Sequence, residues 1–149
     1  DTIFNESMGG GINELLNEFW GAWEDLSASP GGEVERLALV SVSQSLASVF
    51  RQYSDNLSDV RKEADGRIVD GVSQVNEYTS AISNLNDKIV QIERGGDSAN
   101  TLRDERSGLL KKLNKVVDVQ YFEDSDGALN IFLSNGKPLV EGGFSWELD

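Results

Sequence analysis

One stretch of the chain, residues 33–94, contains no proline and repeats apolar side chains at helical spacing almost without a break. A helix over this stretch would place these side chains on one stripe of its surface, here called the apolar stripe. At about 1.5 Å per residue the helix would be about 90 Å long, several times the usual length. It would need partners along the stripe, which favours a bundle or assembly over a compact enzyme. The stripe consists of Leu46, Phe50, Tyr53, Leu57, Val60, Ala64, Ile68, Val72, Val75, Thr79, Ile82, Leu85, Ile89 and Ile92.

Two glycines, Gly66 and Gly71, fall inside this stretch, and each costs a helix about 1 kcal/mol relative to alanine. We expect the helix to continue through them, with a bend or a close neighbour there. Around them the apolar residues are spaced by successive fours, unlike the three-four alternation of a left-handed coiled coil. The pattern therefore predicts packing in a bundle, with Leu57 and Leu85 buried where the stripe is covered. Two short helices would leave part of the stripe uncovered by the chain itself.

Two shorter helices are predicted beside the long one. The first covers residues 12–27, where apolar residues recur every three or four positions until Pro30 and its neighbouring glycines end the helix. Trp20 and Trp23 lie on this helix, and their spacing indicates core residues better than a ligand site. Upstream, the glycines at residues 9–11 indicate a flexible break and lack the lysine and hydroxyl residue of a phosphate loop.

The second short helix covers residues 99–114. Gly95 and Gly96 end the long helix, and Asp97 or Ser98 can cap the next one through a side-chain oxygen. We expect this helix to fold back antiparallel on the long one. Its apolar residues are Leu102, Leu109, Leu110 and Leu113.

After residue 115 the apolar period changes from helical to alternating. A strand is predicted around residues 117–121, with Val117, Val119 and Tyr121 on one face, and a second at residues 128–133 after a turn. The Asn135-Gly136 pair favours a type I′ hairpin, and residues 139–140 and 144–148 can add edges. We therefore predict a helical domain over residues 1–115 and a β-hairpin region over residues 116–149, a candidate start of an outer β domain.

Composition excludes several classes of function. The formal net charge of −13 disfavours nucleic acid and anionic membranes as partners. The chain has no cysteine and no histidine, so thiol chemistry and the commonest general base and metal ligand are missing. No apolar run reaches the ~20 residues that span a bilayer. The acidic residues gather at the two ends, whereas residues 95–115 carry an excess of bases.

Two groups of charged residues are candidates for a functional site. Asp124, Asp126 and Asn130 surround Gly127 as in a calcium loop, but a third acidic position and the closing glutamate are absent, so a plain turn is preferred. Asp104, Glu105 and Arg106, with Arg103, resemble an acid–base cluster, yet salt bridges and caps explain them without a nucleophile. We predict no catalytic, cofactor or metal site and no enzymatic activity.

Five short motifs in order resemble the family of flagellar hook-associated protein 1, the FlgK type, over nearly the whole chain. They are Phe19-Trp20-Gly21-Ala22-Trp23-Glu24-Asp25-Leu26-Ser27 with Pro30; Arg36 opening the long helix; Val75-Asn76 and Ile82-x-x-Leu85-Asn86-x-x-Ile89; Ala99-Asn100-x-Leu102-x-Asp104-x-Arg106; and Gly136-x-x-Leu139-Val140-x-Gly142.

The resemblance implies a structural subunit between the hook and the filament of the bacterial flagellum, exported and assembled outside the cell. It implies a mainly α fold of the flagellin-like D1 type: an elongated bundle of a long helix with shorter antiparallel helices, followed by a small antiparallel β unit. Expected partners are the hook protein, neighbouring hook-associated subunits, further copies in the full-length protein, and an export chaperone acting through segments outside this chain. We expect the chain to be a core fragment from the N-terminal half.

Other classes remain open at this point. A helical-hairpin interaction or spacer module of another secreted or surface protein would share the long helix. Flagellin or the second junction protein is a nearer variant of the leading hypothesis. A carboxylate or metal-dependent enzyme is the third class, and it lacks its usual residues.

Overall fold

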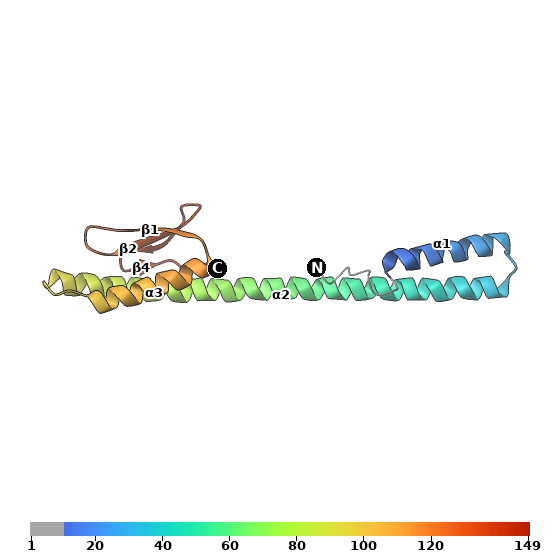
Figure 1. Ribbon diagram of the computed structural model, residues 1–149, viewed down its shortest axis with the longest axis horizontal. Coiled ribbons are helices and arrows are strands. Elements are labelled where there is room, and N and C mark those ends of the chain that lie inside the picture. The colour runs from blue at the N-terminus through green and yellow to red at the C-terminus, as the bar shows by residue number, and fades with distance from the viewer. Residues whose placement is uncertain (1–10) are drawn as a thin grey trace. The chain divides into compact units, whose positions relative to one another are not determined.

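The computed structural model describes residues 11–149, which form three helices followed by four strands (Figure 1). The predicted fold class is confirmed, with a long helix, shorter antiparallel helices and a small antiparallel sheet. Apart from Gly11, the glycine-rich break predicted at residues 9–11 lies outside the described residues. The helices are α1 (Ile12–Ala28), α2 (Glu33–Arg94) and α3 (Asn100–Val116), and the strands are β1 (Val119–Glu123), β2 (Leu129–Leu133), β3 (Pro138–Glu141) and β4 (Phe144–Ser145).

Helix α2 is a single helix of 62 residues, as predicted. It continues through Gly66, where an added Cβ would meet no neighbour, and through Gly71, where a Cβ would lie 3.9 Å from Val116 Cγ1 of α3. The chain divides into two compact units, residues 1–64 and residues 65–149, and α2 contributes residues to both. The boundary predicted at residue 115 follows the change of period and remains a prediction.

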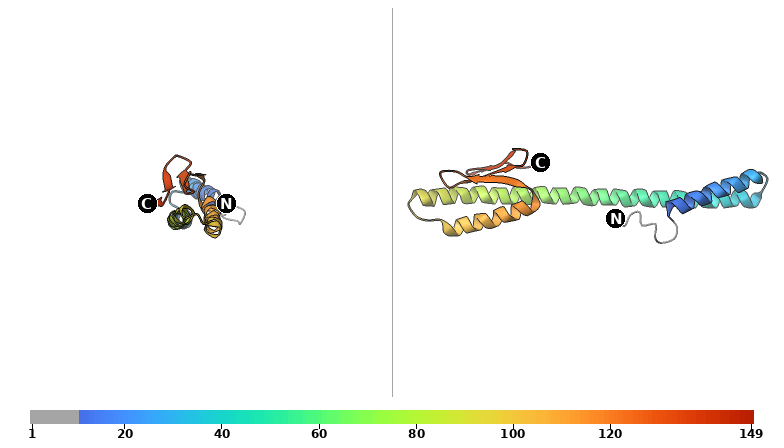
Figure 2. Two further views of the ribbon diagram at one scale, coloured as in Figure 1. Left: turned by 90° about the vertical axis from the view of Figure 1, so that its left-hand side faces the viewer. Right: turned by 45° about the horizontal axis from the view of Figure 1, so that its top comes forward.

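In the first unit, α1 runs antiparallel to the beginning of α2 (Figures 1 and 2). The turn between them is held by Arg36, whose Nη2 donates to the carbonyl of Pro30 at 2.7 Å. Phe19 of α1 is half-buried and contacts Trp20 and Trp23 edge-on, at centroid distances of 5.3 and 6.5 Å.

Burial in the first unit is lower than the sequence predicts. Trp20 and Trp23 are 64% and 47% exposed, so their assignment to the core was wrong. Leu57 is 47% exposed, so its predicted burial was wrong as well. All residues from 54 to 70 are exposed, because no described segment lies on this part of the apolar stripe. Periodicity identifies the apolar face of a helix but not whether another segment covers it.

In the second unit, α3 folds back antiparallel on the end of α2, and the sheet lies beside both helices (Figures 1 and 2). The strands are antiparallel in the order β1-β2-β3-β4. Leu85 and Ile89 pack with Ala99 in one cluster, and the remaining core joins α2, α3 and the sheet. That larger core contains Val75, Ile82, Leu113, Val119, Leu129, Ile131, Leu139 and Val140.

The cap predicted for α3 was wrong. The N-cap residue is Ala99, which makes no side-chain cap hydrogen bond, and Asp97 and Ser98 precede it. Ala99 is buried against Leu85 and Ile89, so packing, and not capping, fixes this end of the helix.

Both longer hairpin turns share one geometry. Gly136 N donates to Leu133 O at 2.8 Å, and Gly127 N donates to Asp124 O at 3.1 Å. Both glycines have a left-handed φ, 83° and 86°, whereas Asn135 does not have a positive φ. A type I′ turn needs positive φ at both central residues, so that prediction was wrong; each turn is a type I turn followed by a glycine bulge.

The strands differ in detail from the expected pattern. β1 begins at Val119, which is buried, and Tyr121 on the same face is 53% exposed. Only residues 144–145 of the predicted segment 144–148 form a strand, β4. Beyond β4, Leu148 is held by a side chain of α2 through hydrogen bonds described below.

Candidate functional site

The most deeply buried polar side chain in the second unit is that of Asn86 on α2. Its Nδ2 donates to the carbonyls of Leu129 at 2.8 Å and Gly142 at 2.7 Å, and its Oδ1 accepts from Leu129 N at 3.0 Å. Oδ1 also accepts from Arg106 Nη1 at 2.8 Å. One amide therefore ties two helices and two segments of the sheet together and leaves none of its own polar atoms unpaired in a dry interior.

Arg106 is the second buried member of this cluster, with 4% of its surface exposed. Besides Asn86, its Nη1 donates to Gly127 O at 2.8 Å, and its Nη2 donates to Glu123 Oε2 at 2.7 Å. A buried guanidinium is costly unless it is paired and hydrogen-bonded. Here a carboxylate, a carbonyl and an amide surround it.

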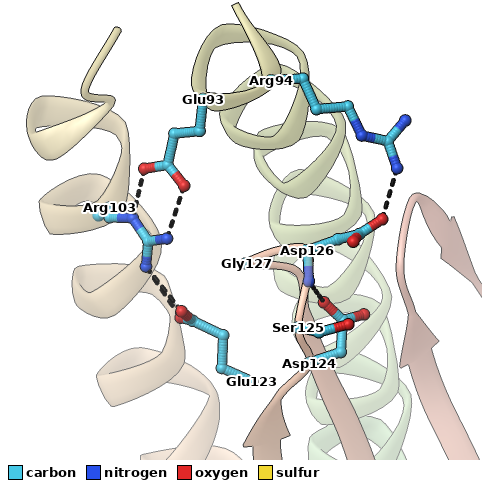
Figure 3. Close-up of a pocket in the computed structure, with 8 residues that line it drawn as sticks. All are labelled: Glu93, Arg94, Arg103, Glu123, Asp124, Ser125, Asp126 and Gly127. Carbon is cyan, nitrogen blue, oxygen red and sulfur yellow. Dashed lines mark hydrogen bonds and ion pairs between the residues drawn. The ribbon is translucent and has the colours of Figure 1, made fainter. Parts of the chain in front are cut away.

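Arg103, one turn earlier on α3, links the same glutamate to the end of α2 (Figure 3). Its Nε and Nη2 each donate to an oxygen of Glu93 at 2.7 Å, and its Nη1 donates to both oxygens of Glu123 at 2.8 and 3.0 Å. Bidentate pairs of this kind fix the relative orientation of the two side chains and are stronger than a single neutral hydrogen bond. Glu123 of β1 is thus shared by two arginines of α3.

Two further asparagines also bond to backbone groups through their side-chain amides. Asn76 of α2 donates to Leu148 O at 2.9 Å and accepts from Leu148 N at 2.8 Å, so it pairs with the backbone as a strand would. Asn130 of β2 accepts from Gly142 N at 2.9 Å. In each case a side-chain amide satisfies backbone groups that the small sheet leaves unpaired.

The ion pair between Glu93 and Arg103 favours the charged form of both groups. The hydrogen bond from Arg103 is the main cause that lowers the pKa of Glu93, and bonds to Glu93 and then Glu123 raise the pKa of Arg103. Burial lowers the pKa of Arg106, and Glu123 opposes that shift. General acid–base catalysis needs a pKa near the working pH, and these shifts move the pKa values of Glu93 and Arg103 further from pH 7.

A shallow polar pocket lies above this cluster, where the end of α2 meets the first hairpin turn (Figure 3). Arg94 on its rim pairs with Asp126. Asp124 faces its own turn: Oδ1 accepts from the backbone N–H groups of Asp126 at 3.0 Å and Ala128 at 2.9 Å. The pocket is lined by Glu93, Arg94, Arg103, Glu123, Asp124, Ser125, Asp126 and Gly127.

Of the three residues weighed as a calcium loop, the structure brings Asp124 and Asn130 together and turns Asp126 away from them. Asp126 turns toward Arg94, and Asp124 Oδ2 accepts from Asn130 Nδ2 at 3.3 Å. Burial raises the pKa of Asp124, but the hydrogen bonds from Ala128, Asn130 and Asp126 outweigh it and lower the pKa overall. Among residues 11–149, no group of three or more acidic side chains is placed to hold a metal ion.

The second charged group separates as well. Arg103 and Arg106 enter the cluster, whereas Asp104 and Glu105 are exposed. Sequence reasoning missed the central role of Asn86, although a signal was present: a polar residue stands beside Leu85 on the buried side of the apolar stripe. Within the part of the chain that the structure describes, no helix has the length and apolar character to cross a bilayer.

Comparison with known proteins identifies the family. The family model described as flagellar hook-associated protein FlgK helical domain matches residues 1–149. Flagellar hook-associated protein 1 of Bacillus subtilis (strain 168) is 29% identical over 93% of the chain and 27% of its own length, and that of Salmonella typhimurium is 31% identical over 92% of the chain and 25% of its length.

A solved structure agrees with these matches. The flagellar hook junction protein FlgK from Burkholderia pseudomallei superposes with a TM-score of 0.85 at 28% identity, over 93% of this chain and 24% of that one. The chain spans about a quarter of the length of the relatives it matches. Asn76, Asn86 and Arg106 stand in the motifs that resemble the family, and they are among the side chains that join the sheet, or the segment after it, to the helices. The chain belongs to the FlgK family of flagellar hook-associated proteins, whose helical domain it matches along its whole length.

Proposed function

We propose that the chain is part of a structural subunit of the bacterial flagellum that links the hook to the filament. The observation that carries this proposal is the match of the FlgK helical domain to all 149 residues. Because the chain spans about a quarter of its relatives, the role of the whole protein is inferred from them.

The candidate site supports a structural role. Its buried polar groups form the hydrogen bonds that join α2, α3 and the sheet, and its arginines are paired with carboxylates. A catalytic group would instead face a space where a substrate can bind, with a pKa suited to proton transfer. We propose that the chain has no enzymatic activity, needs no cofactor or metal, and binds neither nucleic acid nor membrane.

The proposed partners are the hook protein, neighbouring hook-associated subunits and, in the full-length protein, further copies of the same subunit. An export chaperone would act through segments outside this chain, and the assembled protein would lie outside the cell. The exposed part of the apolar stripe supports assembly, because large exposed apolar patches mark interaction surfaces. Phe50, Leu57, Val60 and Ile68 in that part are each at least 46% exposed.

A segment exchange tests the proposal. In Bacillus subtilis, the part of flagellar hook-associated protein 1 that aligns with this chain is replaced by the chain itself. We expect the cells to keep their filaments and to swim. The same exchange carrying Asn86→Ala and Arg106→Ala should weaken the hook–filament connection, whereas the exposed-site control Glu77→Gln should not. An exchanged protein that is exported and folded yet leaves filament subunits shed into the medium would contradict the proposal.

A further inference from the structure

The two edges of the sheet differ in how they are protected. β4 has two residues, too few to offer a partner a row of backbone groups. β1 has five residues and stands at the other edge, where no described strand pairs with it. Natural edge strands are usually blunted by charged side chains, above all lysine, or by proline, a bulge, shortness or a covering segment. β1 has no lysine or proline, its register with β2 is uninterrupted, and its one charged residue, Glu123, is paired with two arginines of α3.

The register shows which backbone groups of β1 are open. Asp124 N donates to Ala128 O at 2.9 Å, so this pair is a hydrogen-bonded one at the end of the ladder. In an antiparallel ladder such pairs alternate, which makes Phe122 and Gln120 the next bonded residues of β1. The N–H and C=O groups of Val119, Tyr121 and Glu123 therefore point away from β2 toward the open edge.

The two faces of this edge have different chemistry. Glu123 reaches α3, so Val119, Tyr121 and Glu123 share the face toward the helices, and Phe122 lies on the other face. Phe122 is 56% exposed and stacks on Phe132 with centroids 5.9 Å apart. The outer face thus offers an apolar platform to a neighbouring strand.

The helix-facing side is a groove between the open edge of β1 and α3. Ser107, Lys111 and Asn114 of α3 line it together with Tyr121 and Glu123 of β1, and the carboxylate of Glu123 is paired with Arg103 and Arg106. Lys111 is exposed, and no ion pair is formed by it within residues 11–149. With Lys112 and Lys115 it makes this end of α3 a basic surface on an acidic chain.

We propose that the β1 edge is a strand-addition site for an extended segment of another protein. In such a complex backbone hydrogen bonds supply affinity, and alternate side chains supply specificity. The segment would present apolar residues toward Phe122 and acidic residues toward Lys111. A second copy using its own β1 fits less well, because a two-fold pairing would bring two sets of α3 lysines toward one groove.

The test uses residues 1–149 and a seven-residue peptide that alternates valine and glutamate. We expect saturable binding, with exchange of the Tyr121 and Glu123 amide protons slowed about tenfold at a peptide concentration about ten times the Kd. The same peptide with lysine in place of glutamate should bind more weakly. Lys111→Glu should weaken binding of the glutamate peptide about fivefold, whereas Lys137→Glu, an equal charge change in the second hairpin turn, should not.

Backbone pairing is tested separately from side-chain docking. Two further peptides are N-methylated on alternate residues, one on each set, so that only one of them loses the donors that face β1. We expect that one to lose binding and the other to keep it. Equal binding of both, or no saturable binding of the unmethylated peptide, would overturn the proposal. Self-association of the chain that Tyr121→Pro abolishes would also overturn it, since the edge would then serve a second copy.

Discussion

The two compact units use the same helix in opposite ways. In residues 65–149, α2 buries Ile82 and Ile89 completely and adds a fully buried asparagine that is bonded on all sides. In residues 11–64, the one apolar side chain of α2 that is buried is Leu46, at 9% exposure. Leu37 and Phe50, on the same helix, are at least half exposed.

The difference shows that the apolar stripe does not by itself create a core. A helix gains stability mainly from the burial of its apolar face, because propensity contributes little. The second unit supplies that burial with α3 and four strands, whereas within residues 11–64 the segment beside α2 is α1. The two units should therefore respond differently to the same substitution.

The largest effect should come from truncating one leucine in each unit. Leu85 is 6% exposed and Leu57 is 47% exposed. We expect Leu85→Ala to lower the free energy of unfolding by about 2–5 kcal/mol and Leu57→Ala to lower it by less than about 1 kcal/mol. Urea unfolding followed by circular dichroism measures both. Equal losses at the two sites would remove the contrast between the units.

The next effect concerns the buried amide. Asn86→Ala leaves Arg106 Nη1 without one acceptor and the backbone of Leu129 and Gly142 without partners. Unsatisfied buried groups cost about 1–3 kcal/mol each, so a loss in or above that range is expected. The control Asn84→Ala removes an exposed amide on the same helix and should change stability by less than about 0.5 kcal/mol. A loss at Asn86 no larger than at Asn84 would mean that water replaces the missing amide.

A pH series sharpens the comparison further. The pKa of Glu93 is lowered from 4.5 in the folded chain, so its pairing with Arg103 stabilises above pH 4.5 and is lost as the pH falls through the folded pKa. Glu93→Gln should therefore lower Tm at pH 7, and the gap in Tm from the parent chain should narrow as the pH falls below 4.5 and through the folded pKa. Glu77→Gln, at an exposed position of α2, serves as control. A gap that persists unchanged at pH 3 would assign the effect to packing and not to charge.

The smallest effect is expected on the exposed side of the first unit. Val40 is 53% exposed and lies inside α2. Because a β-branched residue loses side-chain freedom in a helix, Val40→Ala should raise stability by a few tenths of a kcal/mol. The thermal unfolding midpoint, compared with that of Ile82→Ala, checks the sign. A clear loss at Val40 would show that this face is covered.

The sequence predicted the elements well because their signals are local. Pro30, Gly31 and Gly32 separate α1 from α2, and Gly95 and Gly96 separate α2 from α3, as expected. The type of the second hairpin turn was predicted wrongly, because an Asn-Gly pair fits both a type I′ turn and a type I turn with a glycine bulge.

The candidate site was not predictable in the same way. Asn86 bonds to residues 20, 43 and 56 positions away, and no local pattern encodes such distances. Once Asn86 is placed on the buried side of α2, it must find hydrogen-bond partners because buried polar groups are rarely left unpaired. Which residues those partners are depends on the fold. The exposure of Leu57 could not be predicted either. The sequence pattern around it is the same as that around a buried leucine, and only the fold shows that no described segment covers it.

The link between Asn76 and Leu148 has a consequence for how the second unit forms. It closes a loop of 72 residues, and the bonds of Asn86 to Leu129 and Gly142 close loops of 43 and 56. Contacts so distant along the chain cost closure entropy before they return any energy, and they slow folding. During synthesis the helical hairpin of α2 and α3 is complete before the strands emerge, so the face of the hairpin that the sheet covers stays exposed to water until residues 119–148 have been made.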